Sequence, residues 1–247
     1  MRRVLLSLAA LVIALLAGTK AVAYDCEVDG IYYYRITATE LEVANKVFSD
    51  QNRTAYTGSV TIPSTVTYNG KTFNVTSIGE YAFRDCSQLT SVTIPSSVNV
   101  IKGHAFYNCS QIASITLPTG VTSIGEGAFE GCSSLSQVNI PTGVPAIENE
   151  TFYDCTSLRM VVIPASVASI GENAFSRCAS LISIYLEGKS APAVSPNAFV
   201  KVDRTWCTLY VPKDVKEAYE QDKSWHEFFM EGYAGKWEDL AIPDPTK

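Results

Sequence analysis

The sequence predicts a solenoid, a coil of stacked short repeats, because three residue patterns share one period. Cysteine recurs every 23 residues in the middle of the chain, and a phenylalanine precedes each of these cysteines by three residues. A pair made of an aliphatic residue and proline recurs at the same interval. The members are Cys86, Cys109, Cys132, Cys155 and Cys178; Phe83, Phe106, Phe129, Phe152 and Phe175; and Ile94-Pro95, Leu117-Pro118, Ile140-Pro141 and Ile163-Pro164. A fixed period of about 20 to 50 residues is the sequence signature of a repeat architecture.

Each unit is expected to form one short strand followed by a return segment. In the unit that starts at Cys132, apolar residues alternate or nearly alternate with polar ones, which predicts a strand with one buried face. Pro141 ends this strand because proline has no N–H to donate to a ladder. The apolar residues of this unit are Leu135, Val138 and Ile140 in the strand and Val144, Ile147 and Phe152 in the return. The return is too short for a long helix.

The commonest return motif is Ile-Gly-x-x-Ala-Phe, as at Ile78–Phe83. Glycine favours a turn with positive φ, and alanine favours close contact between coils. Lys102 and Glu148 replace this glycine in two units, and Thr151 replaces the alanine. The turn therefore cannot require glycine in every coil.

The first residues form a separate segment. Arg2 and Arg3 precede the apolar run 4–17, and Ala21-Val22-Ala23 is an A-x-A cleavage site, so residues 1–23 are predicted to be a secretory signal peptide. We expect cleavage and release into the periplasm, the cell surface or the medium. No later apolar run is long enough to span a membrane. Cleavage leaves 16 basic and 25 acidic residues, a net charge of −9. This charge disfavours binding to nucleic acid or to anionic membranes.

The segments on either side of the repeats are expected to cap the open ends of the core. An Asp29-Gly30 turn predicts a hairpin at the N-terminal end, and Asn69-Gly70 predicts a second hairpin inserted in the first unit. At the other end we expect a final strand at 209–212, a helix over 215–222 with Asp214 as N-cap, and an apolar lid. The lid residues are Trp225, Phe228 and Phe229. The predicted organisation is a signal peptide at 1–23, an N-terminal cap at 24–59, repeats at 60–200 with the hairpin insertion at 67–75, a C-terminal cap at 201–233 and a tail at 234–247.

The repeat unit Cys-x-x-Leu-x-x-Val-x-Ile-Pro-x-x-Val-x-x-Ile-Gly-x-x-Ala-Phe resembles the BspA-like leucine-rich repeats, also called the Treponema pallidum type. The resemblance runs from about Val60 to Phe199, and the end that includes Leu209–Lys213 and Trp225 looks like the cap of Bacteroides-type members. This resemblance implies a leucine-rich-repeat solenoid, a curved right-handed coil with a parallel sheet on its concave face and short irregular or 3-10 returns on its convex side. It also implies secreted or cell-surface proteins that bind other proteins, and it implies no catalytic residues.

The in-register cysteines could be metal ligands, disulfides or core residues. Zinc sites favour paired ligands at short spacing such as Cys-x-x-Cys, which the chain lacks. Neighbouring coils lie about 4.8 Å apart, which leaves in-phase Cβ atoms farther apart than a disulfide prefers. We therefore expect buried thiols that act as small apolar fillers. Cys26 and Cys207 lie in opposite caps and are expected to be too far apart to pair.

The sequence does not favour an enzyme, and we expect no catalytic residue, cofactor or metal. The histidines are His104 and His226, in a variable repeat position and in the C-terminal end segment, and a Ser-His-Asp or Cys-His site would have to use one of them. Acidic residues such as Glu126 and Asp154 occupy outward positions that vary between units.

The outward strand positions are the candidate binding residues. The early units carry small polar residues there, whereas the last units bring Arg159, Met160, Val162, Ile182 and Tyr185 together, beside Gln137 and Asn139. Clusters of exposed apolar residues with arginine and tyrosine are typical of interfaces. The alternative is that these residues pack under the C-terminal cap.

The leading functional interpretation is a secreted or cell-surface, non-enzymatic protein that binds another protein, of the host matrix or of a bacterial surface, through the concave face. We expect a monomer without a membrane span and without nucleic-acid partners. The alternative is a structural or assembly component of the bacterial cell envelope. A glycan-binding role is less favoured because tyrosine and tryptophan platforms do not repeat along the array.

Overall fold

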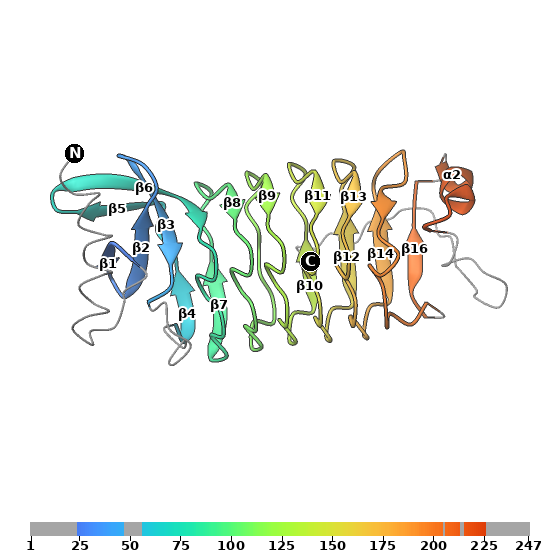
Figure 1. Ribbon diagram of the computed structural model, residues 1–247, viewed down its shortest axis with the longest axis horizontal. Coiled ribbons are helices and arrows are strands. Elements are labelled where there is room, and N and C mark those ends of the chain that lie inside the picture. Colours follow the sequence, from blue (N-terminus) through green and yellow to red (C-terminus); the bar gives the residue numbers. More distant parts are fainter. Residues whose placement is uncertain (1–23, 47–55, 205, 213–214, 226–247) are drawn as a thin grey trace, which may run out of the picture.

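The computed structural model describes residues 24–46, 56–204, 206–212 and 215–225, which form one elongated stack of coils (Figure 1). The N-terminal strands lie at one end of the stack and helix α2 (Lys216–Gln221) lies at the other. Stacked coils joined by parallel strands confirm the predicted solenoid. The predicted signal peptide and tail lie outside the described residues, as do Asp214, His226, Phe228 and Phe229.

The Val-x-Ile segments form parallel ladders. Strand β4 (Gly58–Thr61) pairs with β7 (Leu89–Thr93). Four further strands pair in the order β10 (Gln137–Asn139), β12 (Met160–Ile163), β14 (Ser183–Leu186) and β16 (Thr208–Tyr210). The partners Val138, Val161 and Ile184 follow the 23-residue spacing, whereas Leu209 lies 25 residues after Ile184. Two extra residues in the last return therefore explain why the period fails near the end of the array.

The return segments also contain short parallel strands, which the sequence analysis did not anticipate. Strands β6 (Lys71–Ile78), β8 (Val100–Ile101) and β9 (Ser123–Ile124) form one ladder. Strands β11 (Ala146–Ile147), β13 (Ser169–Ile170) and β15 (Ala193–Val194) form another. Strands of two residues are too short to produce an alternating pattern, so periodicity could not show them.

Proline explains why the parallel strands of the return segments form two separate ladders, with a break between β9 and β11. Thr122 and Ala168 each donate a backbone N–H to the preceding coil, Ala168 to the carbonyl of Pro145 at 2.8 Å. Pro145 occupies the same place between them and has no N–H. The rings of Phe129 and Phe152 lie 5.5 Å apart across this step, the widest spacing in the described phenylalanine stack. The turns and the aromatic core thus hold the coils together where the strands do not.

A stack of phenylalanine rings runs through the core of the repeats. Consecutive rings are nearly parallel, with centroids 5.0 to 5.5 Å apart and interplanar angles of 13° or less. The stack comprises Phe83, Phe106, Phe129, Phe152, Phe175 and Phe199, all essentially buried. Each ring covers the faces of its neighbours, so a single coil could not bury its own core.

The glycine of the return motif has a different role from the one predicted. A Cβ atom on Gly79 would lie 2.6 Å from the carbonyl oxygen of Val43, and one on Gly171 would lie 2.6 Å from the backbone nitrogen of Asn149. The positive φ angles fall two residues later instead, at Tyr81, His104, Gly127, Glu150 and Asn173. The expectation that this glycine supplies a positive φ was therefore wrong; it allows neighbouring coils to approach closely.

Short antiparallel strands close the N-terminal end. Strands β1 (Cys26–Val28) and β2 (Ile31–Arg35) form a hairpin through Asp29 and Gly30, whose φ angles are 51° and 78°. Strand β3 (Glu40–Ala44) continues this sheet and pairs in parallel with β6, and β5 (Thr65–Tyr68) forms a hairpin with β6. The ring of Tyr56 lies 4.7 Å from that of Phe83, so the cap covers the first ring of the stack.

The other end of the stack is covered by α2 and Trp225. Val215 occupies the N-cap position of α2 and makes no side-chain cap hydrogen bond. The Tyr219 hydroxyl donates to the carbonyl of Gly188 at 3.0 Å, and the Trp225 indole N–H donates to that of Pro192 at 2.9 Å. Both side chains are fully buried, which confirms the predicted role of Trp225 in the lid.

Candidate functional site

The in-register cysteines lie in the core and act as hydrogen-bond donors. The thiol of Cys109 donates to the carbonyl of Phe83 in the preceding coil at 3.0 Å, and Cys132, Cys155 and Cys178 repeat this contact at 3.2 Å. Burial raises the pKa of the Cys132 thiol to about 12. A thiol that stays protonated and donates to a carbonyl is a poor nucleophile and a poor metal ligand. The prediction of buried thiols is confirmed, and their hydrogen bonds are an addition to it.

All seven cysteines are buried and none is in a disulfide. Cys26 lies in β1 and Cys207 directly precedes β16, at opposite ends of the stack (Figure 1). Among the described residues, no group of three or more His, Cys, Asp or Glu side chains could hold a metal ion. Within the same residues, no helix is long and apolar enough to cross a membrane.

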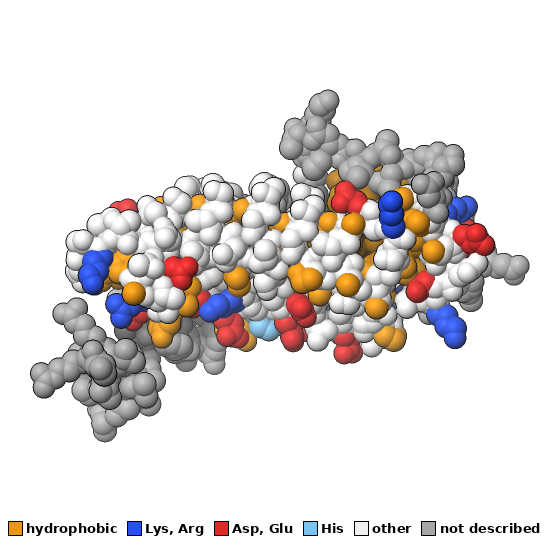
Figure 2. Space-filling view, turned by 90° about the horizontal axis from the view of Figure 1, so that it is seen from above, with side chains coloured by type: hydrophobic (Ala, Val, Ile, Leu, Met, Phe, Trp, Pro, Cys, Tyr) orange, Lys and Arg blue, Asp and Glu red, His pale blue; other side chains and the backbone are white. Residues whose placement is uncertain are grey.

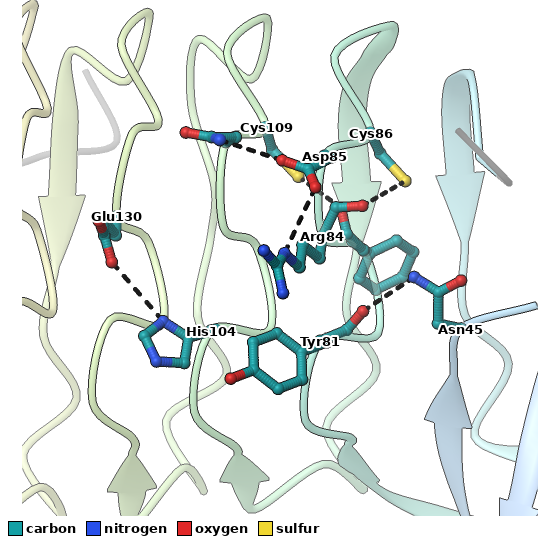
Figure 3. Close-up of polar contacts among 10 residues, drawn as sticks. Asn45, Tyr81, Arg84, Asp85, Cys86, His104, Cys109 and Glu130 are labelled. Carbon is teal, nitrogen blue, oxygen red and sulfur yellow. Dashed lines mark hydrogen bonds and ion pairs between the residues drawn. The ribbon is translucent and has the colours of Figure 1, made fainter. Parts of the chain in front are cut away.

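His104 belongs to an aromatic and charged cluster on the turns of neighbouring coils (Figure 3). Its ring stacks on Tyr81 at 5.2 Å and meets the edge of Tyr107 at 5.8 Å, while the Arg84 guanidinium lies 5.0 Å from both tyrosine rings. The Nδ1 atom lies 3.6 Å from a carboxylate oxygen of Glu130. Figure 2 shows charged side chains and a histidine along one edge of the stack. These interactions of His104 are with two aromatic rings and a carboxylate, and none of them is with a nucleophilic side chain.

Glu130 is the perturbed carboxyl of this cluster. Burial and, after it, the carboxylates of Glu150 and Asp154 raise its pKa to about 7, and the guanidinium of Arg84 opposes them. Structural charge clusters also perturb pKa values, so a raised pKa alone does not indicate catalysis. The ring contacts and the cation–π pairs indicate that this cluster packs the turns together.

The seven candidate binding residues all lie on one surface, which we call the strand face. It consists of the outward side chains of β4, β7, residues 113–116, β10, β12, β14 and β16, together with Arg159 and Ile182. Side chains in register across successive strands form columns. One column contains Gln137, Met160, Ser183 and Thr208; the next contains Asn139, Val162, Tyr185 and Tyr210. A third contains Arg159 and Ile182, where the Ile182 N–H donates to the Arg159 carbonyl at 3.0 Å.

These residues differ in how much of their surface is exposed. Gln137, Asn139 and Arg159 are exposed, Ile182 is 41% exposed, and Met160 is half-buried. Val162 and Tyr185 are each only 6% exposed, although both occupy outward positions. The structure therefore places the candidates together and leaves Arg159 and Ile182 as the accessible part of the C-terminal half.

Three residues in the columns of the candidates were absent from the sequence-based set of seven. Ser183, Thr208 and Tyr210 complete the columns, and the Tyr210 ring stacks on Tyr185 at 4.3 Å with an interplanar angle of 8°. The strand at Tyr210 was predicted, but the extra residues in the last return concealed its register. An alignment of Tyr185-Leu186 with Tyr210-Val211 would have revealed it.

Two pockets among the described residues lie in the caps, away from the strand face. One of about 270 Å³ is lined by Arg35, Lys71 and Phe73, and one of about 250 Å³ by Phe199 and Arg204. Neither contains a residue of the predicted binding set.

The fold and the repeat are shared with other proteins. A model of the BspA type leucine rich repeat region matches residues 76–204 in six copies, which is more than half of the chain. A leucine-rich repeat protein from Bacteroides ovatus is 28% identical, with a TM-score of 0.52, over 76% of this chain and 55% of that one. The leucine-rich repeat protein of T. pallidum is 20% identical, with a TM-score of 0.58, over 87% of this chain and all of that one.

A third similar structure, a leucine-rich repeat protein from Eubacterium ventriosum, is 23% identical with a TM-score of 0.51. The match covers 69% of this chain and 50% of the Eubacterium protein. The chain thus spans about half the length of the Bacteroides and Eubacterium proteins. No curated protein matches it. The six matched copies, together with the stacked coils, show that the chain belongs to the BspA type leucine-rich repeat family.

Proposed function

We propose that this chain is an exported, non-enzymatic binding protein that contacts another protein through the C-terminal half of its strand face. The observation that carries the proposal is the third column, where Arg159 is exposed and Ile182, directly beside it, is 41% exposed. An arginine next to exposed apolar surface is typical of interface centres. The half-buried Met160 adds a flexible apolar side chain to the same surface.

Further support comes from the leader and from the charge. Residues 1–23 have the pattern of a secretory signal, which would place the repeats outside the cytoplasm, at the cell surface or in the surrounding medium. The acidic balance of the remaining chain makes nucleic acid an unfavourable partner. Repeat solenoids offer long regular surfaces for protein recognition.

A pull-down with the full mature chain tests this function. The bait is offered host matrix proteins and bacterial surface fractions, beside a variant with Arg159→Glu and Ile182→Asp. Tyr185 is left unchanged because its burial would confuse a binding defect with loss of the fold. The matched control carries Thr90→Asp and Ala113→Asp, which change exposed residues of the same face in earlier coils.

We expect the wild-type chain and the control to retain a common protein that the Arg159/Ile182 variant loses. Circular dichroism melts would show that all three chains are equally folded. If the Arg159/Ile182 variant retains every protein that the wild-type chain retains, the proposed site is wrong. A defined large assembly in light scattering, with no protein retained, would favour the envelope-component alternative.

A further inference from the structure

The strands of the N-terminal cap form a curled sheet. Five strands pair in the order β1, β2, β3, β6 and β5, at the end of the stack where Figure 1 shows them together. In a flat sheet the two outer strands, β1 and β5, would lie about 19 Å apart. These strands are in contact with each other, so the sheet curls and its concave face encloses a space.

The first three strands contribute one side of this concave face. Residues that lie opposite each other on neighbouring antiparallel strands project from the same face of a sheet. Cys26 of β1 lies opposite Tyr33 of β2, and Arg35, two residues farther along β2, lies opposite Leu41 of β3. The side chains of Cys26, Arg35 and Leu41 therefore share one face.

The inserted β5–β6 hairpin contributes the other side. Tyr68 lies opposite Lys71 across the Asn69-Gly70 turn, and Phe73 follows Lys71 by two residues on the same face. These side chains meet those of the first three strands around the cavity of about 270 Å³ noted above. The hairpin that interrupts the first repeat thus supplies half of the wall of a cavity.

The cavity has an apolar interior and a charged rim. Cys26, Leu41 and Phe73 are buried, whereas the rim residues are exposed. The rim consists of Asp25, Arg35, Tyr68, Asn69 and Lys71. An apolar interior with a few polar groups at the opening is the usual composition of a small-molecule site, and mouths of curled sheets are a common place for one.

The two cations of the rim are free to bind a ligand. Elsewhere in the chain, Lys102 is paired with Glu42, and Arg84 lies over two tyrosine rings. Among the described residues, neither the Arg35 guanidinium nor the Lys71 ammonium has an ion pair, a hydrogen bond or a ring contact. The Asp25 carboxylate accepts the backbone N–H of Arg35 at 2.9 Å, which leaves the guanidinium available.

The charges of the rim select the charge of the ligand. Arg35, Lys71 and Asp25 together carry +1, in a chain whose net charge after signal cleavage is −9. A ligand with one negative charge balances this rim, whereas the Asp25 carboxylate disfavours a second negative charge. The planar guanidinium of arginine can donate two parallel N–H bonds to a carboxylate.

We propose that the cavity of the N-terminal cap binds a small monocarboxylate whose apolar body is about the size of one aromatic ring. The carboxylate lies at the rim against Arg35 and Lys71, and the body lies over Leu41 and Phe73. Drug-sized ligands occupy cavities of roughly 300–1,000 Å³, so this slightly smaller one suits a single ring or a short branched chain. The cavity includes no residue of the strand face, so this site does not depend on the protein-binding function proposed above.

An NMR titration of the full mature chain tests the site, because amide shifts report both the affinity and the place of binding. The probes are 3-phenylpropionate, its uncharged amide and acetate. We expect 3-phenylpropionate to shift the amides of residues 25–26, 35, 41 and 68–73, and the other two probes to bind at least tenfold more weakly. Absence of saturable binding up to millimolar concentrations, shifts outside the cap, or equal affinity for the acid and its amide would overturn the proposal.

Two charge variants give a second measurement. Arg35→Gln and Lys71→Gln should each lower the affinity for 3-phenylpropionate about fivefold or more, since each removes one cation from the rim. Arg35→Gln keeps the backbone N–H that Asp25 accepts, so the strand pairing is preserved. Lys189→Gln, at an exposed lysine beyond β14, is the matched control and should leave the affinity unchanged. Unchanged affinity in both rim variants would contradict the proposal.

A further probe distinguishes two sources of the carboxylate, a free acid and the C-terminal residue of a peptide. The probe is the tetrapeptide Gly-Gly-Gly-Phe with a free C-terminus, and its amidated form is the control. An affinity equal to or above that of 3-phenylpropionate identifies a peptide C-terminus as the ligand, and a lower affinity identifies a free acid. Equal binding of the amidated and free peptides would count against a carboxylate site.

Discussion

Two regions of the strand face share one backbone arrangement and differ in their side chains. Over β4 and β7 the outward residues are small and polar, and the Ser91 hydroxyl donates to that of Ser59 at 2.8 Å. Over β12 and β14 the equivalent residues of the array include Met160 and Tyr185. The inward residues of both regions are of the same kind, since each coil places a phenylalanine in the stack. The repeat therefore determines the inward residues of each coil, whereas the outward residues of the strand face differ between coils.

The largest expected effect tests whether the phenylalanine stack stabilises both regions to the same extent. Phe106 and Phe175 each lie between two parallel rings, at 5.0 and 5.2 Å for Phe106 and at 5.3 Å on both sides for Phe175. Phe106→Ala and Phe175→Ala should each lower the free energy of unfolding by about 3–5 kcal/mol, because each leaves a cavity in the stack. Urea unfolding followed by circular dichroism measures both. A loss in one variant of less than a third of the other would show that the two regions do not share one core.

A smaller effect tests the difference between the faces. Tyr185→Ala removes a buried ring and its stacking contact with Tyr210, so the free energy of unfolding should fall by about 2–4 kcal/mol. Thr93→Ala, in the same column but exposed, should change it by less than about 0.5 kcal/mol. Tyr185→Phe keeps the stack on Tyr210 and serves as the control. Similar losses for Tyr185→Ala and Thr93→Ala would remove the distinction between the regions.

The smallest expected effect concerns the turns where the two regions meet, around Glu130. Its pKa is raised from 4.5 to about 7 in the folded chain, first by burial and then by Glu150 and Asp154. Between these two values the folded state holds a proton that the unfolded state has released, so stability should fall as the pH rises from about 4.5 to 7.

Glu130→Gln removes this titration and should flatten the pH dependence of the melting temperature over that window. At pH 8 the free energy of unfolding of this variant should exceed that of the wild-type chain by ~1 kcal/mol. The gain is smaller than the full pKa shift implies, because the Glu130 side chain is partly solvated. The exposed Glu80→Gln is the control. An unchanged pH dependence in Glu130→Gln would show that this carboxyl is not strained in the folded chain.

Periodicity predicted the parts of the structure that repeat. The 23-residue spacing placed the phenylalanines in one stack and the cysteines in the core, because an in-phase residue meets the same environment in every coil. The same spacing could not show why Gly79 is glycine, since the reason is a carbonyl of another segment, that of Val43. It also missed Tyr210, because the last return is longer than the others.

The direction in which a side chain points could be predicted from the sequence, whereas its exposed fraction could not. The alternation of apolar and polar residues correctly turned Val162 and Tyr185 outward, with Val161 and Ile184 inward. Alternation describes one strand and contains no information about what lies over it. For that reason the sequence identified Arg159 and Tyr185 alike as surface residues, and the structure separates an exposed arginine from a buried tyrosine.

The buried thiols have a practical consequence for spectroscopy. Every cysteine of the chain is enclosed, and four of them already use their hydrogen as a donor to a phenylalanine carbonyl. Reagents that modify thiols need an accessible sulfur atom, and all seven native cysteines are buried. A single cysteine engineered into the strand face can therefore carry a fluorophore or a spin label. The native cysteines need not be substituted, so the core is unchanged during the measurement.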